Sequence, residues 1–331
     1  MRKNSISVIR CIAMCMIIAC HFLQGLGSGL AYWMNLGVQV FLCMSGYLYG
    51  GKKIEQTSKW YLKQYIKIMK PMWILLTIII AVKLVIGVGE TSLISVGLSY
   101  LGVAGFGTLP ELTHTWFITY ILLCYLLTPL LQQIDITQKD KTLLFVIKLG
   151  IILAILEVLY LSRMINFLPQ YLACYIVGYY MAKRQEENND IYEQKRITIG
   201  FLGLAIVLLP IRLYFQYGMI NNVESETVKI LLNHIVEWHH SLLGIALFFI
   251  MLIIFEKIQV KKGKIVSFFE QKSYCIYLVH QIFILNTFSM LHLTDVLVLN
   301  IILILIAIVI SAQVLDFLQK RIVAGKLTSH N

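Results

Sequence analysis

The sequence has few charged side chains, and its cysteines lack the spacing of a metal or redox site. Asp, Glu, Lys and Arg make up 14% of its 331 residues, whereas an ordinary soluble domain carries about 25%. Hydrophobic residues make up 59%, and the mean hydropathy is +0.78. So few polar side chains exclude an ordinary soluble domain. The composition predicts an all-α polytopic membrane protein.

The seven cysteines lie inside apolar runs, without a CxxC pair and without a histidine at a metal-ligand spacing. Small buried thiols are typical of such positions. We therefore expect no disulfide and no metal site. The cysteines are Cys11, Cys15, Cys20, Cys43, Cys124, Cys174 and Cys275.

Acidic residues are scarce as well, which leaves a net charge of +11. The basic residues cluster between apolar runs, as in cytoplasmic loops of membrane proteins. This distribution indicates contact with anionic membrane lipid and excludes nucleic acid as the partner.

Ten runs are apolar and long enough to span a bilayer, which takes about 20 residues. Pro71 is expected to begin the third span and Pro129 to end the fourth. The predicted spans are 5–24, 34–50, 71–88, 115–131, 143–161, 165–183, 197–217, 237–256, 273–291 and 294–317. The first is interpreted as an uncleaved anchor rather than a signal peptide, because nine more spans follow.

The basic residues also predict the orientation of the chain. With the N-terminus inside, 22 of the 28 Lys and Arg residues fall on the cytoplasmic side and two on the outer side. Both termini are therefore expected in the cytoplasm, in a multi-pass protein of the cell membrane, such as a bacterial plasma membrane. Residues 92–107 are interpreted as a short or re-entrant element, because an eleventh span would invert every later loop. We expect residues 1–331 to form one integral-membrane domain with no appended soluble domain.

The first predicted span, which contains IRCIAMCMIIACH, carries Arg10 and His21. Eleven helical residues amount to three turns plus about 20°, so the two side chains share one helix face. Ionisable groups within a span usually face a protein interior or a wet cavity. Arg10 can instead reach lipid phosphate, and His21 can be a hydrogen-bonded interior histidine. Glu157 also lies within a span, and Lys83 either faces the interior or extends to the interface.

Four stretches in order resemble the membrane acyltransferase-3 family. IRCIAMCMIIACH is similar to its Arg-x10-His signature. LGVQVFLCMSGYLYG (36–50) resembles its GVxxFFxxSGYL helix, and HTWFITYILLCYLLTPLL (114–131) resembles its WFxxxYxxxxxxxPLL helix. SYCIYLVHQ (273–281) resembles its late YLxHQ segment.

The resemblance implies transfer of an acyl group, usually acetyl from acetyl-CoA, to hydroxyls of cell-surface glycans. It implies that His21 is catalytic and that Arg10 contacts the donor. The chain departs from the family where Ser7 replaces an acidic residue. It departs again where Gln64 and Lys67 stand for an Arg-x-x-Arg pair.

We expect further site residues on both sides of the membrane. In the loop 52–70, Lys63, Lys67 and Lys70 either bind the phosphates of CoA or bind anionic lipid. Glu157 is predicted to orient the imidazole of His21, which acts either as a general base or as an acyl carrier. The predicted acceptor or cavity-lining residues are Tyr47, His114, Trp116 and His280, with His280 toward the inner end of its span.

Two other functions are compatible with the sequence. One is a glycan exporter or secondary transporter without acyl-transfer activity, although no matching pair of broken helices is visible in the two halves. The other is a membrane-bound partner or sensor that has lost its enzymatic activity, against which the retained Arg10 and His21 argue.

Overall fold

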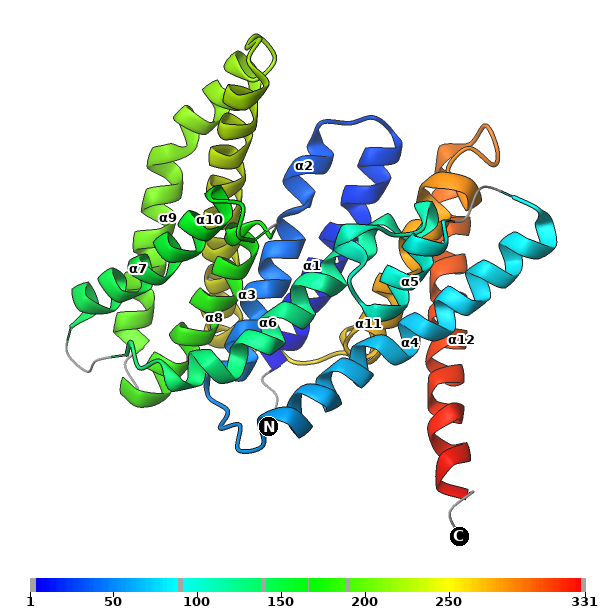
Figure 1. The fold of residues 1–331 in the computed structure, drawn as a ribbon, viewed down its shortest axis with the longest axis horizontal. Coiled ribbons are helices and arrows are strands. Elements are labelled where there is room, and N and C mark those ends of the chain that lie inside the picture. Colours follow the sequence, from blue (N-terminus) through cyan, green and yellow to red (C-terminus); the bar gives the residue numbers. More distant parts are fainter. Residues whose placement is uncertain (1–3, 89–91, 138–140, 166, 189–190, 329–331) are drawn as a thin grey trace. The chain divides into compact units, whose positions relative to one another are not determined.

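The computed structural model describes residues 4–88, 92–137, 141–165, 167–188 and 191–328, and every regular element in these ranges is a helix (Figure 1). This confirms the all-α prediction. The α-helices are α1 (Asn4–Gly25), α2 (Leu30–Met34), α3 (Leu36–Gly50), α4 (Thr57–Ile86), α5 (Leu93–Leu101), α6 (Trp116–Gln133), α7 (Thr142–Leu161), α8 (Pro169–Asn188), α9 (Ile191–Leu213), α10 (Glu226–Lys257), α11 (Lys264–Ile284) and α12 (Leu297–Thr328). Shorter 3₁₀ and π elements are η1 (Ala104–Phe106), η2 (Pro110–Thr115), η3 (Tyr214–Met219) and η4 (Asn286–Phe288).

Within the described ranges, seven helices are long and apolar enough to cross a membrane: α1, α4, η2 with α6, α7, α9 with η3, α10 and α12. Three predicted spans correspond to α3, α8 and α11, which fall outside this set. Helix α3 has 15 residues, or about 22 Å, against a hydrocarbon core of about 30 Å. The count of ten spans and the cytoplasmic termini remain predictions.

Two predicted helix boundaries are wrong. Pro71 lies inside α4, which already begins at Thr57, and Pro129 lies inside α6, which ends at Gln133. Residues 57–70 contain four lysines together with Leu62, Gln64 and Met69, all of which favour helix, so α4 starts well before its apolar part. The predicted loop 52–70 is therefore mostly helical. Helix α5 has nine residues, about 14 Å, which confirms that 92–107 contains a short element.

The helices form two compact units. Unit 1 comprises Met1–Ala13, Asn35–Ile54 and Leu127–Lys262, and unit 2 comprises Met14–Met34, Glu55–Leu126 and Gly263–Asn331.

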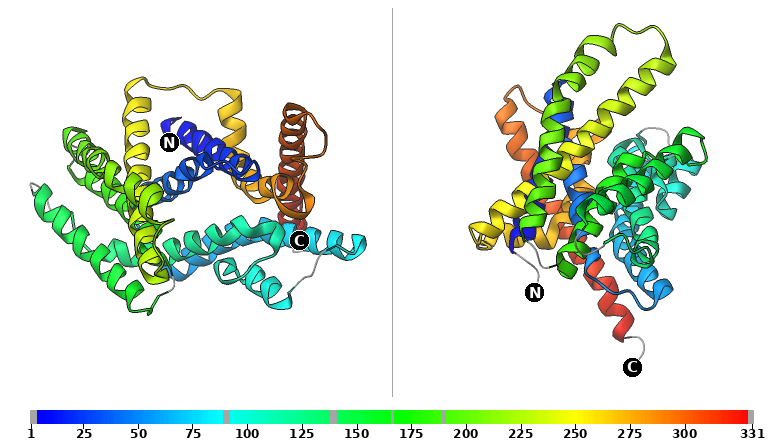
Figure 2. Two further views of the ribbon diagram at one scale, coloured as in Figure 1. Left: turned by 90° about the horizontal axis from the view of Figure 1, so that it is seen from above. Right: turned by 90° about the vertical axis from the view of Figure 1, so that its left-hand side faces the viewer.

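In unit 1, α3 packs against α8 with the two backbones in direct contact. A Cβ at Gly46 would lie 2.0 Å from the carbonyl oxygen of Tyr175, and one at Gly178 would lie 2.0 Å from that of Cys43. Gly46 and Gly50 form the GxxxG spacing that lets membrane helices approach closely. Helix α10 packs against α3, α8 and α9, and Figures 1 and 2 show α9 and α10 side by side.

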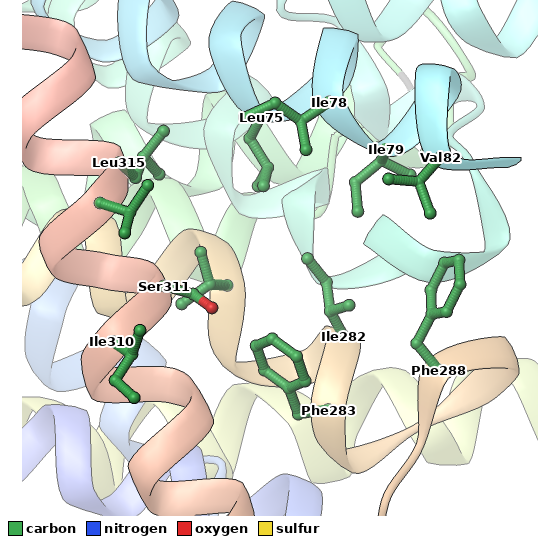
Figure 3. A pocket seen from close by; sticks show the side chains of 12 residues that line it. Leu75, Ile78, Ile79, Val82, Ile282, Phe283, Phe288, Ile310, Ser311 and Leu315 are labelled. Carbon is green, nitrogen blue, oxygen red and sulfur yellow. The ribbon is translucent and has the colours of Figure 1, made fainter. Parts of the chain in front are cut away.

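In unit 2, α11 packs against α4 and α12. An apolar groove of about 320 Å³ lies between these three helices, and Ser311 is its one polar lining residue (Figure 3). Groove residues such as Ile78 and Ile310 are 40% and 57% exposed. Exposed apolar side chains of this kind are typical of surfaces that meet membrane lipid or another molecule, which agrees with a membrane protein.

Candidate active site

Three histidines from separate parts of the sequence meet in unit 2. They are His21 on α1, His114 on η2 and His280 on α11. The ring centroids of His21 and His280 are 4.9 Å apart, those of His114 and His280 5.0 Å, and those of His21 and His114 6.4 Å. His114 and His280 are buried, whereas His21 is partly exposed. The structure therefore brings together three of the predicted site residues. We call them the histidine cluster.

The hydrogen bonds of His280 fix its neutral tautomer. Its Nδ1 lies 2.6 Å from the carbonyl oxygen of Tyr277. A carbonyl oxygen only accepts, so Nδ1 carries the hydrogen, and Nε2 of the neutral ring carries a lone pair. This Nε2 is buried and has no hydrogen-bond partner in the part of the chain that the structure describes.

His114 has the same tautomer for a related reason. The carboxamide oxygen of Gln281 accepts from the backbone N–H of His114 at 2.9 Å and from the hydroxyl of Thr113 at 3.0 Å. These donors identify the atom as oxygen, so the His114 Nδ1 at 2.6 Å also donates to it. The Nε2 of His114 is likewise buried, and none of the described residues bonds it.

The segment that carries His114 is held from several sides. The hydroxyl of Tyr277 donates to the carbonyl of His114 at 2.6 Å. Glu111, one turn earlier, forms a buried ion pair with Lys83 at 3.0 Å and accepts from Thr287 at 3.0 Å. Lys83 is 3% exposed, so it faces the interior. Because a buried ion pair is stable only with such additional bonds, η2 is fixed in place.

The histidine cluster is suited to proton transfer. Two buried Nε2 lone pairs lie beside His21, whose Nδ1 is 3.1 Å from the carboxamide oxygen of Gln24. A neutral imidazole ring carries one N–H donor and one lone pair, so it can both release and accept a proton. Among the described residues, no group of three His, Cys, Asp or Glu side chains is arranged to hold a metal ion.

His280 was predicted toward the inner end of its span, and the side of the membrane that it faces remains a prediction. Helix α11 begins at Lys264, nine residues before the predicted start, and ends at Ile284. His280 therefore lies in the last turns of α11. Sequence reasoning also missed Gln281 as the residue that orients His114. The only signal for it was its place in the YLVHQ stretch.

The predicted donor-side residues lie on α1 and α4. Arg10 is half-buried on α1, in unit 1. Lys63, Lys67 and Lys70 recur at i, i+4 and i+7 of α4, so the helix aligns them on one face. Lys63 and Lys67 are exposed, and the Nζ of Lys70 donates to the carbonyl of Gln319 at 2.6 Å.

Glu157, the predicted orienting carboxylate, lies in unit 1. One of its oxygens contacts Nε2 of His234, and the other accepts from Nε1 of Trp238 at 3.1 Å. Its role beside His21 remains a prediction.

Tyr47 and Trp116 lie among other aromatic rings. In unit 1, the hydroxyl of Tyr47 donates to Gln185, and its ring meets Phe248 edge-on at 5.6 Å. In unit 2, the half-buried ring of Trp116 lies edge-on to Tyr120 at 5.4 Å. Both sets of contacts are ordinary aromatic packing, and the acceptor-binding roles remain predictions.

Comparison with known proteins gives one result. A family model described as an acyltransferase domain matches residues 3–316, which is nearly the whole chain. No curated protein and no solved structure matches the chain.

Proposed function

The chain belongs to this acyltransferase family, and from that premise we propose that it transfers an acetyl group from cytoplasmic acetyl-CoA to a hydroxyl of a cell-surface or extracellular polysaccharide. The family match and the seven long apolar helices of the described chain indicate a multi-pass membrane protein. The observation that carries the proposal is the histidine cluster. The rings of His280 and His114 lie 4.9 and 6.4 Å from the ring of His21 between centroids, and each has a buried Nε2 that no described residue bonds.

In the proposed reaction, His21 is the general base. It takes the proton of a sugar hydroxyl while the hydroxyl oxygen attacks the thioester carbonyl carbon. The new C–O bond forms, the C–S bond breaks, and the CoA thiolate leaves and recovers the proton. In protonated His21, Nδ1–H donates to Gln24, and one of the bare Nε2 lone pairs of His114 and His280 can accept from Nε2–H.

The donor side of the proposal rests on charge. Acetyl-CoA is a cytoplasmic molecule with several phosphates, and the exposed face formed by Lys63 and Lys67 on α4 offers positive charge to them. Arg10 is assigned to the donor in the same way. This arrangement requires the beginnings of α1 and α4 to lie on the cytoplasmic side, as the distribution of basic residues predicts.

The test is replacement of His21 in the full-length protein in membranes. His21→Ala is expected to abolish both release of free CoA and acylation of the glycan, with the amount of inserted protein unchanged. The matched control is His292→Ala, which removes an exposed histidine of unit 2 outside the cluster and should retain full activity. Arg10→Ala should raise the KM for acetyl-CoA.

Full acyl transfer by His21→Ala would contradict the catalytic role. A second experiment distinguishes a general base from an acyl carrier. The wild-type enzyme is incubated with acetyl-CoA without a glycan, and the reaction is then quenched. An acetylated His21 peptide in the mass spectrum would replace the general-base step with an acyl-carrier step.

A further inference from the structure

Lysines from three helices of unit 2 meet at one end of the apolar groove. The Nζ of Lys70 on α4 donates to the carbonyl oxygen of Gln319 on α12 at 2.6 Å. The carboxylate of Asp316 on α12 accepts from Lys272 on α11 and, at 2.7 Å, from Lys320 on α12. In this set of contacts three ammonium groups meet a single carboxylate, so positive charge is in excess. We call Lys70, Lys272 and Lys320 the basic end of the groove.

The order of residues along each helix places the three lysines at the same end. On α4 the groove begins at Leu75, five residues after the lysine, and on α11 it begins at Val279, seven residues after the lysine. On α12 it ends at Leu315, five residues before the lysine. Five to seven helical residues rise about 8–11 Å. Each lysine therefore lies one or two turns beyond the apolar lining.

The groove itself is open on one side and closed on the other. Ile282 of α11 is buried, whereas Val314 of α12 is 50% exposed. Figure 3 shows Leu315 and Phe288 on opposite sides of the space into which the lining side chains point. A volume of about 320 Å³ is at the low end of the range for small ligands, which suits a single hydrocarbon chain.

An apolar groove that ends in excess positive charge matches the two parts of an anionic phospholipid. Its acyl chain fits the apolar lining, and its phosphate is a partner for lysine ammonium groups. The glycerol and ester groups lie between phosphate and chain, as the one or two turns between lysines and lining require. The basic end also belongs to the segments predicted to be cytoplasmic, where the membrane leaflet carries anionic lipid.

We infer that the groove between α4, α11 and α12 binds one anionic phospholipid, with an acyl chain between the helices and the phosphate at Lys70, Lys272 and Lys320. A zwitterionic lipid binds less well, because its own cation approaches the same lysines. The inference is independent of the proposed function, because this lipid is not a reactant.

The first test concerns the charge of the site. The full chain in detergent is titrated with dioleoylphosphatidylglycerol or with zwitterionic dioleoylphosphatidylcholine, and native mass spectrometry gives the Kd of the first bound lipid. Lys320→Gln leaves Asp316 its contact with Lys272. This change is expected to weaken binding of phosphatidylglycerol about fivefold, the usual contribution of one basic residue to contact with anionic lipid. Binding of phosphatidylcholine should stay the same.

The matched control for charge is Lys264→Gln. Lys264 is the first residue of α11, is exposed and lies two turns before Lys272, outside the basic end. Its replacement removes the same charge from the same unit and should leave the Kd of both lipids unchanged.

The second test concerns the place of the acyl chain. Val314→Trp fills the groove, and its matched control is Val309→Trp. Val309 lies on the same helix, is 36% exposed and does not line the groove. Val314→Trp is expected to weaken binding of phosphatidylglycerol about tenfold, because the chain and the indole compete for one space, and Val309→Trp should not. Ile310→Phe, at another exposed lining position, gives a second measurement if Val314→Trp inserts poorly.

Preferential binding of phosphatidylglycerol that is weakened in Lys320→Gln and Val314→Trp, and retained in both controls, would support the site. Equal binding of the two lipids by the wild type, or equal effects of Lys320→Gln and Lys264→Gln, would overturn the phosphate contact. Unchanged binding in Val314→Trp and Ile310→Phe would overturn the place of the chain. A dimer in the wild-type spectrum that Val314→Trp dissociates would show that a second copy of the chain covers the groove instead.

The two proposals fail separately. These titrations contain neither acetyl-CoA nor glycan, so a wild type that binds the lipid as expected but transfers no acyl group would refute the proposed function only. A wild type that transfers the acyl group but does not distinguish the two lipids would refute the lipid site only.

Discussion

Replacing Gln281 with leucine tests whether the orientation of His114 matters for catalysis. The change removes three hydrogen bonds to one oxygen, from the backbone N–H and ring Nδ1 of His114 and from the hydroxyl of Thr113. At a net value of about 1 kcal/mol each, they amount to about 3 kcal/mol. If all of this stabilisation is needed in the transition state, the rate falls roughly 100-fold. If part of this stabilisation already acts in the folded enzyme without substrate, its loss lowers the free energy of unfolding instead of the rate.

The assay is steady-state acyl transfer with both substrates varied. We expect Gln281→Leu to lower kcat and to leave the KM for acetyl-CoA unchanged, because the side-chain oxygen of Gln281 bonds Thr113 and His114 and not the residues assigned to the donor. Gln281→Glu keeps an accepting oxygen and should recover most of the rate. Nitrogen-15 NMR of labelled histidine provides a readout that a purely structural role would not change, because it distinguishes the Nδ1–H form of His114 from the Nε2–H form.

Two results would refute this reasoning. One is a wild-type kcat in Gln281→Leu. The other is a His114 ring that keeps its Nδ1–H form after the carboxamide has been removed.

Two further predictions concern stability, measured as thermal unfolding in nanodiscs. Gly46→Ala should lower the free energy of unfolding by about 1–3 kcal/mol, because its new methyl would lie 2.0 Å from a backbone oxygen. Gly150→Ala in α7, where a Cβ meets no atom within 4 Å, should raise it by about 1 kcal/mol. Equal effects of these two changes would contradict the close α3–α8 contact. Lys83→Met should lower the free energy of unfolding by about 3–5 kcal/mol, because it leaves Glu111 buried without its cation. The double variant Lys83→Met, Glu111→Leu should regain most of this loss. A double variant no better than the single one would show that the ion pair is not the source of the loss.

Composition and local pattern were sufficient for the helical class of this protein and for the positions of most helices. They failed where local propensity and the apolar run disagreed. The apolar run near Pro71 suggested a helix start there, yet the lysine-rich residues before it extend α4 back to Thr57. The start of α11 was misplaced in the same way, and with it the place of His280 along the helix.

The site was predictable in part. Arg10 and His21 stand out because ionisable groups are rare within apolar runs. By contrast, the meeting of His21 with His114 and His280 depends on contacts between residues that are far apart in sequence.

The direct backbone contact between α3 and α8 has a consequence for genetic screens. Random mutagenesis for lost activity will recover substitutions of Gly46, Gly50 and Gly178 as well as substitutions of His21. A glycine has no side chain that could take part in the reaction. Such variants will fail to accumulate in the membrane, whereas His21 variants will accumulate and remain inactive. An immunoblot of each mutant therefore separates helix assembly from catalysis before any enzyme is purified.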